Sequence, residues 1–332
     1  MNCKETGDTI KLYPLKFKPI IKERIWGGKR LKDVLHKDVS AEAKAGESWE
    51  LSAVPGSVSV VVNGDLTGRD LTGIISEYKG ILLGRNVYDR FGENFPLLIK
   101  FIDAEDNLSV QVHPDDILAR EFHGGFGKTE MWYVMDSEPG AKLISGFSRK
   151  TDEADFRKCL DSGSLPEIMA EHTVKRGDTF FIPAGRVHAI GRGIMLAEIQ
   201  QSSDLTYRIY DYDRVDSNGL KRELHVEMGA KALNFNDVES GYVNKGCESR
   251  GFAPLVDSEY FKTNILNIPV IRERNYSGID SFVILMCVEG DAVMVSEGKE
   301  YNLSYGETIL IPASVNDIEF ISEHARLLET HL

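Results

Sequence analysis

The chain is poor in cysteine, and this shortage excludes two classes of protein. Its four cysteines among 332 residues are scattered without a CxxC pair, at Cys3, Cys159, Cys247 and Cys287. We therefore expect neither a disulfide framework nor a thiolate zinc site. Reduced, mostly buried thiols of a cytosolic protein fit this usage better.

Positive charge and long apolar runs are also scarce. Lys and Arg number 39 against 52 Asp and Glu, so the net charge is −13. Because nucleic-acid binders hold phosphates with Lys and Arg, we expect no nucleic-acid partner. No stretch approaches the roughly 18 apolar residues of a membrane span, and the N-terminus lacks the apolar segment of a signal peptide. The sequence predicts a soluble cytoplasmic protein without a membrane or obligatory protein partner.

The apolar residues that are present fall mainly in short stretches bounded by Gly, Pro, Asp and Asn. This pattern predicts strands at 57–66 (ending in a hairpin turn), 94–104, 108–114, 130–136, 178–184 and 194–201. Helical spacing occurs at 71–84, at 151–172, where Pro166 separates two short helices, and at 221–235. The length suggests about two domains of roughly 150 residues. The whole pattern predicts a mainly β protein, a barrel or jelly roll with a few added helices, and excludes a βαβ enzyme.

A faint internal repeat supports two β-rolls. Residues 174–190 resemble residues 303–320: both have a Gly-Asp/Glu turn, a strand that ends in Ile-Pro-Ala, and then a loop. This alignment pairs Gly177 with Gly306 and His188 with Asp317. Because the second copy has Asp in place of His and no histidine pair nearby, we expect the second roll to have no metal site.

Four polar residues of the first predicted roll form a candidate metal site. Gln111 and His113 are two residues apart, so in a strand they point to the same face. Glu130 opens the next predicted strand, and His188 follows the Ile-Pro-Ala-Gly turn. Such a mixed set of nitrogen and oxygen ligands suits Zn²⁺ or another divalent ion. The alternative is that these histidines are hydrogen-bonded scaffolding, which is the commoner role of a lone histidine on a strand.

Four charged residues lie in or beside apolar strands, where an unpaired charge is costly. They are Lys100, Lys128, Glu198 and Arg208. Each alone is typical of a strand edge or a solvated position. Together, around a polar cavity, they would form an anion-binding and acid–base site.

These residues also carry a resemblance to a known family. The blocks LLIKFIDAEDNLSVQVHPDD (97–116), GKTEMWYV (127–134), FIPAGRVHAI (181–190) and EIQQSSDLTYRIYDYDR (198–214) resemble type I mannose-6-phosphate isomerases (phosphomannose isomerases) of the short bacterial form. The blocks KPIIKERIWGGKRL (18–31) and GESWELSAVPG (46–56) are similar too.

The resemblance implies a division into two cupin-like β-rolls. Residues 1–245 would form the catalytic domain, with a short helical insertion near 151–172. Residues 246–332 would form a second cupin-like roll without a metal site.

The resemblance also assigns roles. The family's zinc ligands correspond to Gln111, His113, Glu130 and His188, with one Zn²⁺ per chain. Its catalytic arginine, ten residues after a glutamate, corresponds to Arg208 after Glu198. Lys100, Ser109 and Lys128 match positions that line the family's substrate pocket, although the residues that bind phosphate are not fixed by this match.

The expected reaction interconverts mannose 6-phosphate and fructose 6-phosphate through a cis-enediol, and the partner is therefore a small sugar phosphate. Glu198, Lys128 and an ordered water are all candidates for the proton transfer, and Arg208 would steady the enediolate or bind phosphate. Two alternatives keep the rolls and the metal: an Fe(II) cupin dioxygenase, and a non-catalytic sensor of sugar phosphates.

Overall fold

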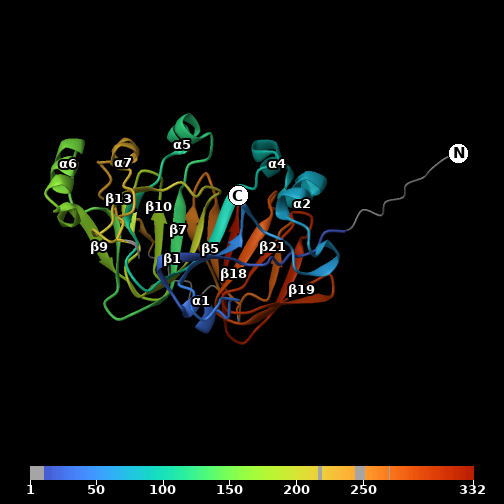
Figure 1. The fold of residues 1–332 in the computed structure, drawn as a ribbon. Helices are drawn as coiled ribbons and strands as arrows, with labels where there is room; N and C mark the ends of the chain where they lie inside the picture. Colours follow the sequence, from blue (N-terminus) through green and yellow to red (C-terminus); the bar gives the residue numbers. More distant parts are fainter. Residues whose placement is uncertain (1–10, 216–218, 244–250, 269) are drawn as a thin grey trace.

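The computed structural model describes residues 11–215, 219–243, 251–268 and 270–332. Within these ranges the chain forms two β-rolls that lie side by side, the first running from blue to yellow and the second in orange and red (Figure 1). The strand pairings described in the sheets are all antiparallel. Cys3 and Cys247 lie outside the described residues, whereas Cys159 and Cys287 are buried free thiols.

The first roll has a seven-stranded and a five-stranded sheet. In spatial order the larger sheet contains β1 (Ile20–Gly28), β2 (Ala45–Leu51), β5 (Leu97–Ala104), β12 (Ile194–Gln201), β7 (Glu130–Ser137), β10 (Thr179–Ile182) and β14 (Tyr242–Val243). The smaller sheet contains β13 (Tyr207–Tyr210), β6 (Val110–Val112), β11 (His188–Ala189), β8 (Lys142–Phe147) and β9 (Met169–Thr173). A short hairpin of β3 (Ala53–Val54) and β4 (Ser57–Val58) is separate.

The second roll repeats this plan with fewer strands. Its larger sheet contains β15 (Phe252–Asp257), β16 (Lys262–Asn267), β23 (Ala325–His331), β18 (Val283–Gly290) and β21 (Thr308–Ile311). Its smaller sheet contains β17 (Glu273–Asn275), β22 (Asp317–Ile321), β19 (Ala292–Ser296) and β20 (Lys299–Leu303). The mainly β fold with two rolls is therefore confirmed.

The helices are short and sit at the edges of the rolls. They are α1 (Arg30–Asp33), α2 (Leu71–Tyr78), α3 (Gly80–Leu83), α4 (Arg85–Phe91), α5 (Asp116–His123), α6 (Glu153–Asp161) and α7 (Val226–Ala232), with 3₁₀ turns η1 (Gly64–Leu66) and η2 (Leu165–Ile168). Figure 1 shows α2, α4, α5, α6 and α7 along one edge and α1 at the opposite edge. Asp70, Asp115 and Asp152 cap α2, α5 and α6 by accepting a backbone N–H. No described helix is long and apolar enough to cross a membrane.

Strand alternation decides which side chains reach the interior of the first roll. On β5, Leu97, Ile99 and Phe101 belong to a core that both rolls share, whereas Lys100 and Ile102 line a cavity inside the first roll. Successive side chains of a strand point to opposite faces, so this sorting follows from the period of two. A register slip of one residue would move Lys100 into the apolar core.

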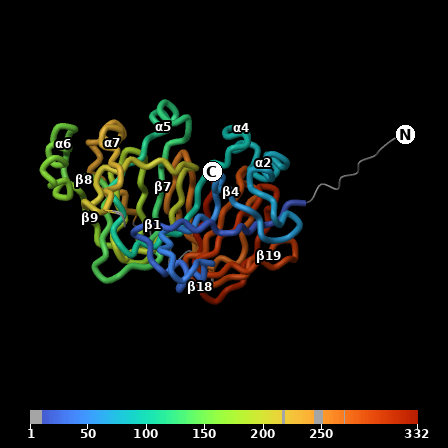
Figure 2. Tube along the Cα trace, in the orientation of Figure 1, coloured from blue at the N-terminus to red at the C-terminus, as the bar shows by residue number. Residues whose placement is uncertain are grey.

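The shared core joins the two larger sheets. The first roll contributes Met195 and Ile199 of β12, and the second contributes Ile284 and Met286 of β18 and Leu328 of β23; these side chains are buried in one cluster. The N-terminal segment, blue in Figure 2, also connects the rolls, because Leu15 pairs through its backbone with Leu310 of β21. The second roll therefore supports the back of the sheet that carries the first roll's cavity.

The internal repeat corresponds to equivalent strands. Gly177 precedes β10 and Gly306 precedes the equivalent strand β21. Their φ angles of 90° and 82° are a left-handed conformation that favours glycine. His188 lies buried in β11, and its counterpart Asp317 is exposed at the start of β22, where it accepts a hydrogen bond from Asn275. The two positions thus share a place in the fold but not an environment.

Some predicted elements differ in extent or type. The strand expected over 57–66 shortens to β4 and isolated bridges before η1, and the helix expected over 71–84 breaks at Lys79 (φ 50°) into α2 and α3. The helix expected within 221–235 is the shorter α7. The prediction of a second helix was wrong for residues 169–172, because they pair with β8 as strand β9.

The predicted domain boundary between residues 245 and 246 falls outside the described residues. β14 of the first roll ends at Val243 and β15 of the second begins at Phe252. The division into domains 1–245 and 246–332 stays a prediction.

Candidate active site

A cavity of about 450 Å³ lies inside the first roll between its two sheets. Six of the residues predicted for the site line it: Lys100, Ser109, Gln111, Lys128, Glu198 and Arg208. The walls include Trp26 and Trp49, which are both buried.

Beside this cavity, three buried side chains gather their ligand atoms. His113 Nε2 is 3.1 Å from His188 Nε2, 3.4 Å separates His113 Nε2 from Glu130 Oε2, and 3.5 Å separates His188 Nε2 from Glu130 Oε1. Tetrahedral ligands about 2.0–2.1 Å from one zinc ion stand roughly 3.3 Å apart. Within the described parts of the chain, this is the one group of three or more His, Cys, Asp or Glu side chains close enough to hold a metal ion.

Unsatisfied polar atoms also fit a cation. Glu130 Oε2 is buried and lacks a hydrogen-bond partner among the described residues. A carbonyl can only accept, so His188 Nδ1 donates to Arg186 O at 2.9 Å, which leaves the Nε2 lone pair directed at the cluster. An isolated buried carboxylate oxygen is costly, and a bound metal ion would remove that cost.

The two imidazoles are held neutral, as metal ligands must be. Burial, followed by the charge of Lys128, lowers the pKa of His113 well below its ordinary value. Burial also lowers the pKa of His188, although Glu130 opposes that effect.

The fourth predicted ligand, Gln111, lies on β6 directly opposite two other site residues. Its Cα pairs with that of His188 on β11 and with that of Arg208 on β13. Side chains of directly paired residues share one face of a sheet. The cavity lining includes Gln111 and Arg208, so this is the face that looks into the roll.

A second polar group forms around Glu198 on β12. Lys100 Nζ donates to Glu198 Oε2 at 2.7 Å and to Gln200 Oε1 at 2.6 Å, and Trp132 Nε1 donates to Glu198 Oε1 at 2.9 Å. Burial is the largest single influence on Lys100 and lowers its pKa, but the carboxylates of Glu198 and Glu47 outweigh it and the net pKa is raised. Glu198 is therefore a carboxylate held in one orientation by two donors.

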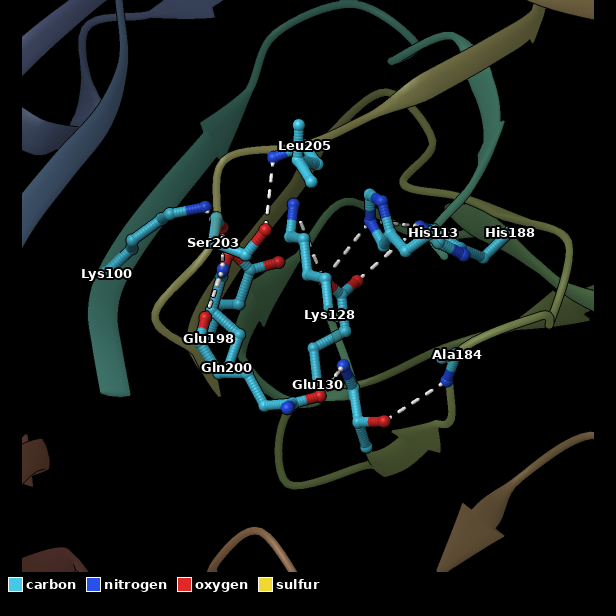
Figure 3. Close-up of polar contacts among 12 residues, drawn as sticks. Lys100, His113, Lys128, Glu130, Ala184, His188, Glu198, Gln200, Ser203 and Leu205 are labelled. Atoms are coloured by element: carbon cyan, nitrogen blue, oxygen red, sulfur yellow. Dashed lines mark hydrogen bonds and ion pairs between the residues drawn. The ribbon is translucent and has the colours of Figure 1, made fainter. Parts of the chain in front are cut away.

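Lys128 lies between the two groups. In Figure 3 its side chain stands between the Lys100–Glu198 pair and the two histidines, and its Nζ is 3.7 Å from Glu130 Oε2. Burial first, and then the neighbouring Lys100, lower the pKa of Lys128. An ammonium group with a lowered pKa gives up its proton more readily than an ordinary lysine.

Arg208 occupies the cavity wall on β13. Its Nη1 donates to Glu223 O at 2.8 Å, whereas its buried Nε lacks a hydrogen-bond partner among the described residues. Burial and the nearby Arg222 lower its pKa. A guanidinium with unused donors in a cavity can bind an anionic group.

Sequence reasoning missed several residues that shape the cavity. Glu47 on β2 accepts hydrogen bonds from Arg24 and Trp49, and Arg222 reaches the lining from the chain after β13. Alternation within GESWELS could have placed Glu47 and Trp49 on one face. Sequence spacing offered no comparable signal for Arg222.

Comparisons with known proteins identify the family of this chain. Residues 14–139 match the family described as phosphomannose isomerase type I, catalytic domain, and residues 253–332 match the mannose-6-phosphate isomerase cupin domain. The mannose-6-phosphate isomerase of Streptococcus mutans is 34% identical over 326 residues, which cover 94% of this chain and 98% of the relative. Mannose-6-phosphate isomerase ManA of Bacillus subtilis is also 34% identical, covering 96% and 99%.

Solved structures give the same result. The mannose 6-phosphate isomerase from Bacillus subtilis superposes with a TM-score of 0.85 at 33% identity, covering 96% of this chain and 99% of that one. A mutant phosphomannose isomerase from Salmonella typhimurium has a TM-score of 0.75 at 17% identity, covers 96% and 99%, and supports the fold alone. With relatives this similar over nearly the whole length, the chain belongs to the type I phosphomannose isomerase (mannose-6-phosphate isomerase) family.

Proposed function

We propose that this protein is a metal-dependent aldose–ketose isomerase that interconverts mannose 6-phosphate and fructose 6-phosphate. The observation that carries the proposal is the buried His113–Glu130–His188 cluster beside a cavity lined by Lys100, Glu198 and Arg208. A cation site next to acid–base and anion-binding groups is the combination that isomerisation of a sugar phosphate requires.

The proposed cofactor is one Zn²⁺ per chain, held by Gln111, His113, Glu130 and His188. Two imidazoles and two oxygen donors suit zinc, and the short separations among His113, Glu130 and His188 support a single ion. Bound there, the ion would act as a Lewis acid that stabilises negative charge on the substrate's oxygen atoms.

The chain's own residues would carry the proton. Isomerisation removes a proton from C2 of the aldose and delivers one to C1. Glu198 and Lys128 are the candidates for this transfer, because both line the cavity and both are buried from bulk water. A positioned acid–base group contributes about 10²–10⁴-fold in rate.

Three residues would bind and orient the substrate. Arg208 offers guanidinium donors to the enediolate or to phosphate, Lys100 fixes Glu198 and adds positive charge, and Ser109 offers a hydroxyl at the cavity wall. The burial of Lys100 and Ser109 supports fixed positions for both side chains.

The alternatives are not favoured. The curated relatives are named isomerases and match over nearly the full length, which supports neither a dioxygenase nor a non-catalytic sensor. We also propose a cytoplasmic location, because the described cysteines Cys159 and Cys287 are free buried thiols, as is usual in a reducing compartment.

A coupled assay with mannose 6-phosphate tests the proposal. Purified protein should form fructose 6-phosphate, and Glu198→Gln should be much slower while it keeps its metal. If folded, metal-replete protein gave no turnover, the isomerase proposal would fail. Calorimetric binding of mannose 6-phosphate would then separate a sensor from a protein with another substrate.

A further inference from the structure

One end of the cavity carries an arginine cluster of which the proposed reaction uses only Arg208. Arg208 and Arg222 both line the cavity, and Arg214 binds the same carboxylate, Asp211, as Arg222 does. Arg222 follows β13 by a dozen residues, yet its charge lowers the pKa of Arg208, for which burial is the larger cause. Two guanidinium groups that close together in one cavity wall repel each other unless an anion joins them.

A single buried carboxylate organises this arginine cluster. Asp211 accepts Arg222 Nε at 2.8 Å and, at its other oxygen, Arg222 Nη2, so the two side chains form a bidentate pair. Asp211 Oδ1 also accepts Arg214 Nη2 at 2.6 Å. The pair fixes one edge of the Arg222 guanidinium. Its Nη1 makes no hydrogen bond within the described residues.

The arginine cluster has fewer carboxylate partners for each positive charge than Arg24 and Lys100 have. Arg24 has its own carboxylate, with Nη2 2.9 Å from Glu47 Oε2, and Lys100 has Glu198 at 2.7 Å. By contrast, one buried carboxylate, Asp211, is shared among Arg208, Arg214 and Arg222. Two other carboxylates near this end are in contact with water. Asp106, 3.6 Å from Arg214, is half exposed, and Asp204 at the cavity lining is exposed. These three half-buried arginines have one buried carboxylate between them, so the excess of positive charge is at the arginine end of the cavity.

We propose that Arg222, aligned by Asp211, binds the phosphate group of the substrate together with Arg208, and so determines the preference for a phosphorylated sugar. This inference rests on the proposed isomerase function for the identity of the sugar, but the anion site itself does not depend on turnover. A phosphate monoester carries nearly two negative charges and three acceptor oxygens at neutral pH, which match two guanidinium forks. Asp211 is a positioning residue, because it acts through Arg222.

The kinetic test compares Arg222→Ala with a matched control. KM for mannose 6-phosphate should rise about 10- to 100-fold, the usual effect of losing one charge-assisted contact, while kcat changes by less than about threefold. The control is Arg157→Ala, which also removes a bidentate arginine, here paired with Glu227 on the exposed surface. Both kinetic constants should stay unchanged in the control.

Two further variants separate positioning from folding. Asp211→Asn should raise KM in the same direction with kcat preserved, since Arg222 keeps its charge but loses its alignment. Arg222→Lys should fall between the wild-type protein and Arg222→Ala, because a lysine supplies charge without the fork. A merely structural role would lower the folded fraction and leave KM unchanged.

Calorimetric titration with inorganic phosphate tests the anion site without turnover. Phosphate affinity should fall in Arg222→Ala by a factor similar to the rise in KM, and should be unchanged in Arg157→Ala. Equal phosphate affinity and equal KM in folded Arg222→Ala would overturn the inference, and so would a loss of kcat at unchanged KM. A further outcome is that the wild-type protein binds phosphate but has no isomerase activity, and that Arg222→Ala removes the binding. The proposed function would then fail and the anion site would stand.

Discussion

Glu198 on β12 and Glu329 on β23 occupy the same register position in the two rolls. The repeat aligns Ile182 with Ile311, which pair with Glu130 and Val283 respectively. Two residues further along these strands, Trp132 pairs with Glu198 and Leu285 pairs with Glu329. The same carboxylate thus lies at the same place in both sheets, but beside a different set of neighbours.

The neighbours leave a cavity beside Glu198 in the first roll and surround Glu329 with protein side chains in the second. Glu329 is fully buried and accepts hydrogen bonds from three side chains, those of Asn264, Arg274 and Tyr276, whereas Glu198 accepts from two and also lines the cavity. Where the first roll has Glu130, the second has Val283 in its apolar core. Glu329 therefore stabilises its roll, whereas Glu198 faces a cavity.

Matched substitutions of these glutamates should have different effects. Glu198→Gln should lower kcat by about 10²–10⁴-fold, because it removes a candidate proton carrier. Glu329→Gln should lower the free energy of unfolding by about 3–5 kcal/mol, since it breaks a buried ion pair with Arg274, and should leave kcat per folded molecule unchanged. Urea denaturation and steady-state kinetics on both variants check this. A large loss of kcat in folded Glu329→Gln would give the second roll a catalytic role.

Removal of a metal ligand should abolish metal retention and activity together. His113→Ala or His188→Ala takes one of the paired Nε2 atoms from the cluster. Elemental analysis of the purified variants should find less than a full complement of metal. Asp317→Ala, at the exposed counterpart of His188, should keep both metal and activity. Full metal content and full turnover in either histidine variant would show that the ligand assignment is wrong.

Arg208→Ala should separate catalysis from metal binding. The variant should keep its metal, because its side chain lies opposite Gln111 on the next strand and is not itself a proposed ligand. Its kcat/KM should fall by about 10²–10³-fold through the loss of a donor to developing negative charge. Unchanged kinetics would remove Arg208 from the mechanism.

The stability of the protein should depend on pH through Glu47. Burial raises the pKa of this carboxyl, but Lys100, Arg24 and the Trp49 hydrogen bond outweigh burial and hold the folded-state pKa below its ordinary 4.5. Glu47 thus contributes stability that is fully present above 4.5 and is lost as the pH falls through the lower folded-state value. Glu47→Gln should therefore flatten the acid limb of stability against pH. An unchanged slope below 4.5 in urea melts would contradict this.

Local sequence signals could predict the strands of the site because the side chains repeat with a period of two. That period predicts Gln111 and His113 on one face, although β6 ends at Val112, one residue before His113, and β7 begins at Glu130, the last residue of the KTE block. The close approach of His113 to His188 could not be predicted from their positions in the sequence, because it depends on the pairing of β6 with β11. Residue type and strand position suggested the group of candidate ligands, and the family resemblance implied the same four residues.

Short elements that bury few residues were harder to predict. The helix α5 is eight residues long and only Ala119 in it is buried, whereas Ile117 is 77% exposed, although Asp115 gives a capping signal. Strand β9 was hidden in a stretch with helical spacing, because its pairing with β8 is a tertiary contact. Likewise, the Asp211–Arg222 pair is set by the path of the chain after β13 and has no local sequence signature.

The central claim is that a metal ion at the His113–Glu130–His188 cluster enables this chain to isomerise mannose 6-phosphate. The most direct measurement is turnover of the purified protein before chelation, after chelation, and after zinc is added back, with metal content determined at each stage. We expect activity to disappear with the metal and to return in proportion to bound zinc. Full turnover in verifiably metal-free protein would contradict the account.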